Sequence, residues 1–372
     1  MKLYFHYTQP QKFVNGEWVI DSEINRIIKE IKKINPDKIV IISEVELMMI
    51  DLWIKFFNQI MPWLEENDKY INFVLPAVRN LGINRVIEES GTSCIRSYGT
   101  GHFFSDYNEH VHYNLRPNLI KDHIGHLNIH VSKLFSCYNN SFKEHRYHII
   151  ELICKHKMLD EGIVTLAHPK EIMWYPHLKW NYHDGSPLKN AEPNFQLNQK
   201  GYHAYALPKY FNNCLIDIVT ESWYENDQYC ITEKTLKSIG MCKPFLALSC
   251  KGYYKNYLVK KFGFELYDEV FDYSFDDCDD VQERAKLLFD NILKYRYEFN
   301  DPNFKRRFYQ KINQKLMRNR FRVIDILNDK DIMIPECLKI LNTEKVELYG
   351  EVTYEHGENI VTYIRDMGWI VE

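Results

Sequence analysis

The stretch that decides the fold is Tyr229–Ser249, which reads Y-C-I-T-E-K-T-L-K-S-I-G-M-C-K-P-F-L-A-L-S. A polar cluster opens a short helical pattern, and an apolar run typical of a buried strand follows a Lys-Pro step. Thr232 is placed to cap the helix, and Glu233 suits the positive end of the helix dipole. Lys234 works against that dipole at a cost of roughly 0.3–1 kcal/mol. A phosphate bound at the helix start would offset this cost, whereas an exposed lysine with no ligand is the simpler alternative.

Strand and helix patterns alternate on both sides of this stretch. Apolar, β-branched runs predict strands at Lys2–His6, Lys38–Ser43, Tyr70–Pro76, Lys133–Tyr138, Gly162–Ala167, Cys214–Thr220, Pro244–Leu248 and Glu265–Asp268. Helical spacing predicts helices at Ser22–Lys33, Val45–Glu65, Glu144–Leu159, Tyr253–Phe262, Val281–Leu293 and Asn303–Ile324. Such alternation is typical of α/β domains with parallel sheets covered on both faces.

The chain of 372 residues is long enough for two such domains. We expect an N-terminal α/β domain over residues 1–130 and a second α/β domain over residues 131–300. Residues 301–372 are expected to form helices and a tail that pack back on the domains. The expected fold class is therefore two doubly wound, Rossmann-like domains facing a cleft, with a C-terminal helical segment. Open parallel sheets bind ligands beyond the carboxyl ends of their strands.

Composition narrows the classes of protein that fit. The net charge is −4, which disfavours a broad nucleic-acid-binding surface. Nine cysteines without a C-x-x-C pair predict buried thiols and a cytoplasmic location rather than a zinc site. Residues 1–12 lack the apolar core of a signal peptide, and the charges within Lys38–Trp63 predict a strand and an amphipathic helix instead of a membrane span.

Two segments resemble a known family. Thr220–Asp277 resembles the donor-binding half of GT-B glycosyltransferases, among which α-1,3-fucosyltransferases and exostosin-like enzymes carry a similar I-T-E-K stretch before a helix, a proline and an apolar strand. Upstream, F-S-C-Y-N-N-S-F-K-E-H-R-Y-H-I-I-E-L-I resembles a segment of phage and viral glycosyltransferase-like proteins with the same downstream motif. Together the two segments cover roughly residues 132–285.

The resemblance implies roles for individual residues. Glu233 would hold the ribose hydroxyls of a nucleotide-sugar, and Lys234 would neutralise the diphosphate leaving group. Arg146, with Lys143 or His145 nearby, would form a second phosphate clamp, since the guanidinium fork suits phosphate. The expected donor-binding residues are Lys143, Arg146, Glu221, Tyr224, Tyr229, Thr232, Glu233, Lys234 and Thr235.

Alternatives stay open for four of these residues. Arg146 could be a surface charge on a helix, and Glu221, at a strand end, could cap a helix instead of contacting a ligand. Tyr224 and Tyr229 could stack on the base or be ordinary packing aromatics.

The implied chemistry is sugar transfer. Lysine, arginine and helix N–H groups would stabilise the leaving nucleoside diphosphate in place of a metal, so no cofactor is expected. Inverting transfer also needs a base for the acceptor hydroxyl, which the family places in the N-terminal half. Candidate bases are Glu44, Glu46, His102, Asp106 and His110, any of which could equally be structural.

The sequence thus predicts a metal-independent, inverting glycosyltransferase that takes a nucleotide-sugar donor and a glycan, protein or modified-nucleobase acceptor. The alternative is a nucleic-acid-associated protein, either a DNA-base glycosyltransferase or a non-catalytic binding module. It would use the basic run at residues 305–322, whose apolar positions Phe308, Ile312, Leu316 and Phe321 are expected on one helical face. The acidic run Phe275–Asp280 resembles a D-x-D metal site, but a turn that caps the next helix is favoured.

Overall fold

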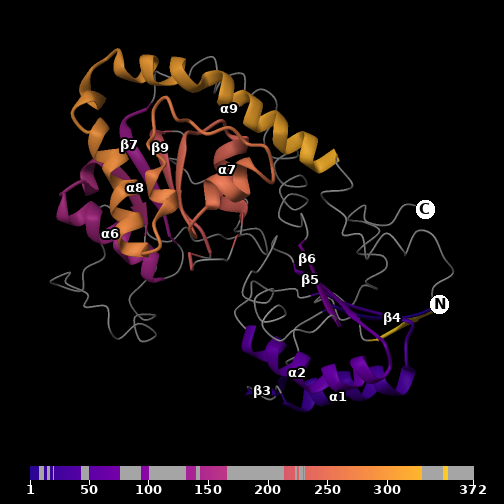
Figure 1. Ribbon diagram of the computed structural model, residues 1–372. Helices are drawn as coiled ribbons and strands as arrows, with labels where there is room; N and C mark the ends of the chain where they lie inside the picture. Colours follow the sequence, from indigo (N-terminus) through magenta and orange to yellow (C-terminus); the bar gives the residue numbers. More distant parts are fainter. Residues whose placement is uncertain are drawn as a thin grey trace. The chain divides into compact units, whose positions relative to one another are not determined.

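The computed structural model is a mixed α/β protein with parallel sheets (Figure 1). It describes residues 1–7, 12–14, 17–19, 21–42, 50–75, 94–99, 131–139, 143–165, 213–222, 224–225, 229, 231–328 and 347–350. The chain divides into two compact units. Unit 1 comprises Met1–Ser105, Asp227–Cys230 and Leu327–Glu372, and unit 2 comprises Asp106–Asn226 and Ile231–Ile326.

Unit 1 contains a parallel sheet with strand order β11-β1-β4-β5-β6. Its strands are β1 (Lys2–Tyr7), β4 (Lys38–Ile42), β5 (Ile71–Leu75), β6 (Ile95–Gly99) and β11 (Glu347–Tyr349). A separate hairpin joins β2 (Lys12–Val14) and β3 (Glu17–Val19). The C-terminal tail therefore contributes an edge strand to the sheet that the N-terminus begins.

Helices α1 (Asp21–Ile34) and α2 (Ile50–Glu66) lie side by side in unit 1 (Figure 1). Helix α2 holds Pro62 inside it and places Trp53 against Phe73 of β5, with ring centroids 4.8 Å apart. Strand β4 and helix α2 are the two elements expected within Lys38–Trp63. None of the helices in the described ranges has the length and apolar character needed to cross a membrane.

Unit 2 contains a four-stranded parallel sheet with order β10-β9-β7-β8. The strands are β7 (Lys133–Tyr138), β8 (Gly162–Thr165), β9 (Cys214–Thr220) and β10 (Phe245–Leu248). From β7 the chain moves outward to β8, and it then returns to place β9 on the other side of β7. The strand order therefore reverses between β7 and β9, which makes this position a topological switch point.

Helices cover the sheet of unit 2. Helix α6 (Glu144–Lys155) lies beside α8 (Val281–Tyr295), while α7 (Glu233–Gly240) packs against β9 and β10 (Figure 1). Right-handed crossovers that run in opposite directions place α6 and α7 on opposite faces. All residues of β9 are buried, as expected for a central strand with both faces covered.

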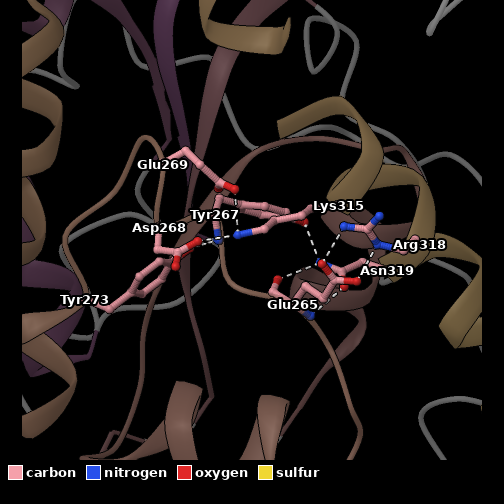
Figure 2. A network of polar contacts seen from close by, with 8 residues as sticks. All are labelled: Glu265, Tyr267, Asp268, Glu269, Tyr273, Lys315, Arg318 and Asn319. Carbon is pink, nitrogen blue, oxygen red and sulfur yellow. Dashed lines mark hydrogen bonds and ion pairs between the residues drawn. The ribbon is translucent and has the colours of Figure 1, made fainter. Parts of the chain in front are cut away.

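One predicted strand was wrong. Glu265–Asp268 is irregular, because side chains of α9 (Phe304–Asn328) and a tyrosine satisfy its backbone (Figure 2). The amide of Glu265 donates to Asn319 Oδ1 at 2.7 Å, and Asn319 Nδ2 donates to the Glu265 carbonyl at 2.8 Å. The amide of Tyr267 donates to the Tyr273 hydroxyl at 3.1 Å. An apolar pattern cannot reveal that backbone groups pair with side chains rather than with a neighbouring strand.

The basic helix α9 uses many of its cations within unit 2. Lys315 pairs with Asp268 and with Glu269, and Arg318 donates to both carboxylate oxygens of Glu265 (Figure 2). The positive charges of Lys315 and Arg318 are therefore paired with carboxylates of the same unit rather than directed toward an external anion.

The expected apolar face of α9 needs one correction. Phe308, Ile312 and Leu316 are buried, but Phe321 is 55% exposed. It lies 13 residues after Phe308, which is about 220° around the helix and therefore on the opposite side. The expected location of Phe321 was wrong for this reason.

The acidic run before α8 has a capping role, as the sequence favoured. Asp280 is the N-cap of α8 and accepts from the amide of Glu283 at 2.8 Å. Asp276 accepts from the amides of Tyr254 and Lys255, both at 2.9 Å, in the π-helix η4 (Tyr253–Val259).

Candidate functional site

Two helices begin close to the switch point of unit 2. Helix α6 starts shortly after β7, and its N-cap residue Lys143 makes no side-chain capping bond. Helix α7 starts a short loop after β9, with Thr232 as its N-cap. The N-terminal turns of both helices present backbone N–H groups and positive partial charge, which favours a bound anion.

The segment after β9 is tied to the first turn of α6 by several polar contacts. Lys143 Nζ donates to the Ser222 carbonyl at 2.8 Å, and His145 Nε2 donates to the Glu221 carbonyl at 2.7 Å. The Tyr224 ring stacks on His145 with centroids 4.4 Å apart, and its hydroxyl donates to Glu144 at 3.0 Å. Together these contacts tie Glu221, Ser222 and Tyr224 to the first turn of α6.

The charges of three nearby cations act on the ring of His145. This ring is fully buried, and burial lowers the pKa of His145 well below its ordinary value, with further lowering by the charges of Arg146, Lys143 and Lys234. A carbonyl oxygen can only accept, so the proton of the neutral ring lies on Nε2. The neutral ring adds no charge of its own, so the positive charge of this region comes from Lys143, Lys234 and Arg146.

Arg146 is only 3% exposed, so the alternative of a surface helix charge was wrong. Its charge also lowers the pKa of Cys137, which lies in β7 and whose pKa is raised overall by burial. Arg146 is therefore near the carboxyl end of β7, in the first turn of α6. The planar guanidinium fork matches the geometry of a phosphate.

The first turn of α7 carries Lys234. Its backbone amide donates to the Thr232 hydroxyl at 3.3 Å, which is the capping bond expected from the sequence. Its ammonium donates to the hydroxyls of Ser222 at 3.3 Å and Thr232 at 3.4 Å. Such long contacts to neutral oxygens are weaker than a bond to an anion, so a phosphate would compete well for this ammonium.

Glu221 has 0% exposure and directs its carboxylate into the protein. The carboxylate accepts from the amide and hydroxyl of Thr232, from the Thr235 hydroxyl at 2.6 Å and from the Tyr253 hydroxyl at 3.2 Å. These contacts agree with the capping alternative for Glu221, because the carboxylate fixes the start of α7 to the end of β9.

A second buried carboxylate supports the other end of α7. Asp217 of β9 accepts from Ser136 of β7 at 2.8 Å and from Ser238 of α7 at 2.6 Å. Burial raises the pKa of Asp217. The network joins three elements beneath the switch point and limits movement of α7 relative to the sheet.

Comparison with models of known protein families and with the sequences of curated proteins gives no match. Among solved structures, the crystal structure of an alpha1,3-fucosyltransferase is similar to this chain, with 8% sequence identity and a TM-score of 0.37. The similarity covers 87% of this chain and 90% of that fucosyltransferase chain. A similarity with so low a TM-score gives no ground for assigning an activity to this chain, so its chemistry has to be derived from the side chains.

The structure places most of the expected donor-binding residues in unit 2, at the two helix starts and the end of β9: Lys143, Arg146, Glu221, Tyr224, Thr232, Lys234 and Thr235. Tyr229 is half-buried and belongs to unit 1. Glu233 is the first residue of α7, but its side chain lies outside the described residues, as do Glu44, Glu46, His102, Asp106 and His110.

Sequence reasoning missed two residues of this region. Ser222 accepts from Lys143 through its carbonyl and from Lys234 through its hydroxyl, and Tyr253 reaches Glu221 from η4. The signal available for Tyr253 was the pair of tyrosines directly after Gly252, because two adjacent large aromatics are favoured where their rings can be buried. Among the described residues, no His, Cys, Asp or Glu side chains gather in a group of three or more that could hold a metal.

Proposed function

We propose that the chain is a glycosyltransferase that moves a sugar from a nucleoside-diphosphate sugar to an acceptor hydroxyl. One observation carries the proposal: Lys143, at the start of α6, and Lys234, in the first turn of α7, both donate to Ser222, just after β9, at the topological switch point of unit 2. Ligands of open α/β sheets bind at such points, and clustered cations beside two helix N-termini select an anionic ligand. The resemblance of the T-E-K-T stretch to the donor motif of GT-B enzymes supports the same ligand class.

The three cations would have different roles at the diphosphate. Lys143 stays bonded to the Ser222 carbonyl and supplies charge, whereas Lys234 can turn from its hydroxyl partners toward a phosphate oxygen. Arg146 would clamp a second phosphate oxygen. Negative charge grows on the nucleoside diphosphate as the glycosidic bond breaks, and prearranged positive groups stabilise it. In this proposal the chain needs no metal at the diphosphate.

Inversion at the sugar carbon requires a base that takes the proton of the acceptor hydroxyl as the oxygen attacks. We assign this base to one of Glu44, Glu46, His102, Asp106 and His110. Each is a carboxylate or imidazole able to accept a proton near neutral pH once its pKa is suitably tuned. Replacing each in turn, by glutamine, asparagine or alanine, would reveal the one whose loss abolishes transfer without loss of nucleotide binding.

The proposal can be tested without knowledge of the acceptor. Glycosyltransferases that bind a nucleotide-sugar also transfer the sugar slowly to water, which releases the nucleoside diphosphate. We expect release from at least one member of a panel of UDP-, GDP-, ADP- and CDP-sugars, together with a rise in melting temperature for the same nucleotide. Arg146→Ala should abolish both effects, whereas Arg318→Ala, on α9, should not. A wild-type chain that neither binds nor cleaves any member of the panel would contradict the proposal.

A further inference from the structure

We infer that Glu221 and Tyr253 are positioning residues that act through Lys234, and that neither contacts the donor. This inference rests on the proposed function, because it concerns the same diphosphate site. Its basis is a chain of hydrogen bonds that runs from the Tyr253 hydroxyl through the Glu221 carboxylate and the Thr232 hydroxyl to the Lys234 ammonium.

The direction of the hydrogen bonds follows from the chemistry of each group. The Glu221 carboxylate can only accept, so the Thr232 hydroxyl donates its single proton to Glu221 Oε2. The lone pairs of the Thr232 oxygen are then available to the amide and the ammonium of Lys234, at 3.3 and 3.4 Å. Without Glu221 the Thr232 hydroxyl could rotate, and Lys234 would lose one of the contacts that orient it, while its contact with Ser222 would remain.

Tyr253 completes the other side of the carboxylate. Its hydroxyl lies 3.2 Å from Glu221 Oε1 and 3.1 Å from the Thr235 hydroxyl, which itself donates to Oε1 at 2.6 Å. Burial raises the pKa of Tyr253 well above its ordinary value, so the phenol remains a donor throughout the working pH range.

The backbone of η4 holds Tyr253 in place. Gly252 adopts φ +73° before the π-helix, a left-handed conformation that suits glycine, and the Asp276 carboxylate accepts from the amides of Tyr254 and Lys255. A π-helix is uncommon and often occurs at functional sites. Here it directs two consecutive tyrosines to different partners: Tyr253 to Glu221, and Tyr254 through its hydroxyl to the amide of Ala247 in β10.

A double-mutant cycle tests the inference. The variants are Tyr253→Phe, Lys234→Met and the double variant, and Tyr295→Phe is a matched control that removes another buried phenol bond in unit 2. Isothermal titration with ADP, CDP, GDP and UDP identifies the tightest of these ligands for the wild type, and this ligand is then titrated into each variant. We expect Tyr253→Phe to weaken binding about fivefold, the effect of one lost hydrogen bond, and Tyr295→Phe to leave binding within twofold.

In the Lys234→Met background, Tyr253→Phe should change affinity by less than about twofold, because the residue through which it acts is gone. An equal loss in both backgrounds, or no loss in either, would overturn the inference. Hydrogen exchange gives a readout that needs no ligand. Tyr253→Phe should speed exchange of the first amides of α7 about fivefold and leave α8 unchanged.

The two measurements separate the possible failures. If the wild type binds none of the four nucleotides, the proposed function fails, and hydrogen exchange alone then decides whether Tyr253 orders the start of α7. If the wild type binds but Tyr253→Phe alters neither affinity nor exchange, the proposed function stands and the positioning role is refuted.

Discussion

Replacing Lys234 by methionine should separate binding from stability. The substitution keeps the length of the side chain and removes only the ammonium. In the structure that ammonium donates to two hydroxyls at 3.3 and 3.4 Å, and it lies in the first turn of α7, where its charge opposes the helix dipole. Removing the charge gains roughly 0.3–1 kcal/mol from the dipole and loses two weak bonds of similar total value. The free energy of unfolding should therefore change by less than about 1 kcal/mol.

Binding of a nucleoside diphosphate should respond far more. Two unit charges about 4 Å apart interact by about 4 kcal/mol at an effective dielectric constant of about 20. Desolvation of the ammonium and the phosphate leaves about 1.5–3 kcal/mol for a charge-assisted hydrogen bond. At about 1.4 kcal/mol for each factor of ten, Lys234→Met should weaken binding about 10- to 100-fold.

Calorimetric titration measures this loss, and urea denaturation of the same preparations measures stability. Lys237→Met is the matched control, because Lys237 lies in the same helix and the net charge changes equally. We expect the control to weaken binding less than about threefold, since a solvent-screened charge contributes little at a distance. If both variants lost the same affinity, only the overall electrostatic field of unit 2 would matter for binding, and the reasoning about Lys234 would be wrong.

Three further predictions concern stability. The folded pKa of His145 lies well below its ordinary value of 6.5, so the unfolded chain binds this proton first. The free energy of unfolding therefore carries no penalty from His145 above about pH 6.5, and below that pH it falls by up to about 1.4 kcal/mol per pH unit because of this residue. His145→Gln should remove that part of the pH dependence when the free energy of unfolding is measured by denaturation at pH 7, 6 and 5. Lys157, two residues beyond the last residue of α6, has φ +56°, so Lys157→Gly should raise the free energy of unfolding by about 0.5–1 kcal/mol. Lys155→Gly, at the last residue of α6, should lower it, and the reverse order would exclude a strained helix end. Arg284 is buried and donates to the carbonyls of four residues, so Arg284→Met should lower the free energy of unfolding by at least about 3 kcal/mol. Arg318→Met, at an exposed ion pair, should lower it by less than about 1 kcal/mol. Similar losses for both variants would show that the four carbonyls find other donors.

Much of unit 2 could be predicted from local patterns. Strands β7 and β9 have the bounds that their apolar runs indicated, and Thr232 and Asp280 cap the helices that follow them. These features depend on a few consecutive residues, because strand propensity and capping are short-range effects. The same reasoning failed where distant side chains satisfy a backbone, as Asn319 does for Glu265.

The sequence by itself determined most strands and helices of unit 2, and it marked the start of α7 as a position where a cation opposes the helix dipole. Only the tertiary structure decided which strands are neighbours. Strand β9 lies beside β7 although the paired residues Ser136 and Asp217 are 81 positions apart. That pairing buries Arg146, turns Glu221 inward and brings Lys234 near His145. Burial and long-range charge interactions depend on which surfaces meet in the folded chain, and no local pattern of residues encodes that.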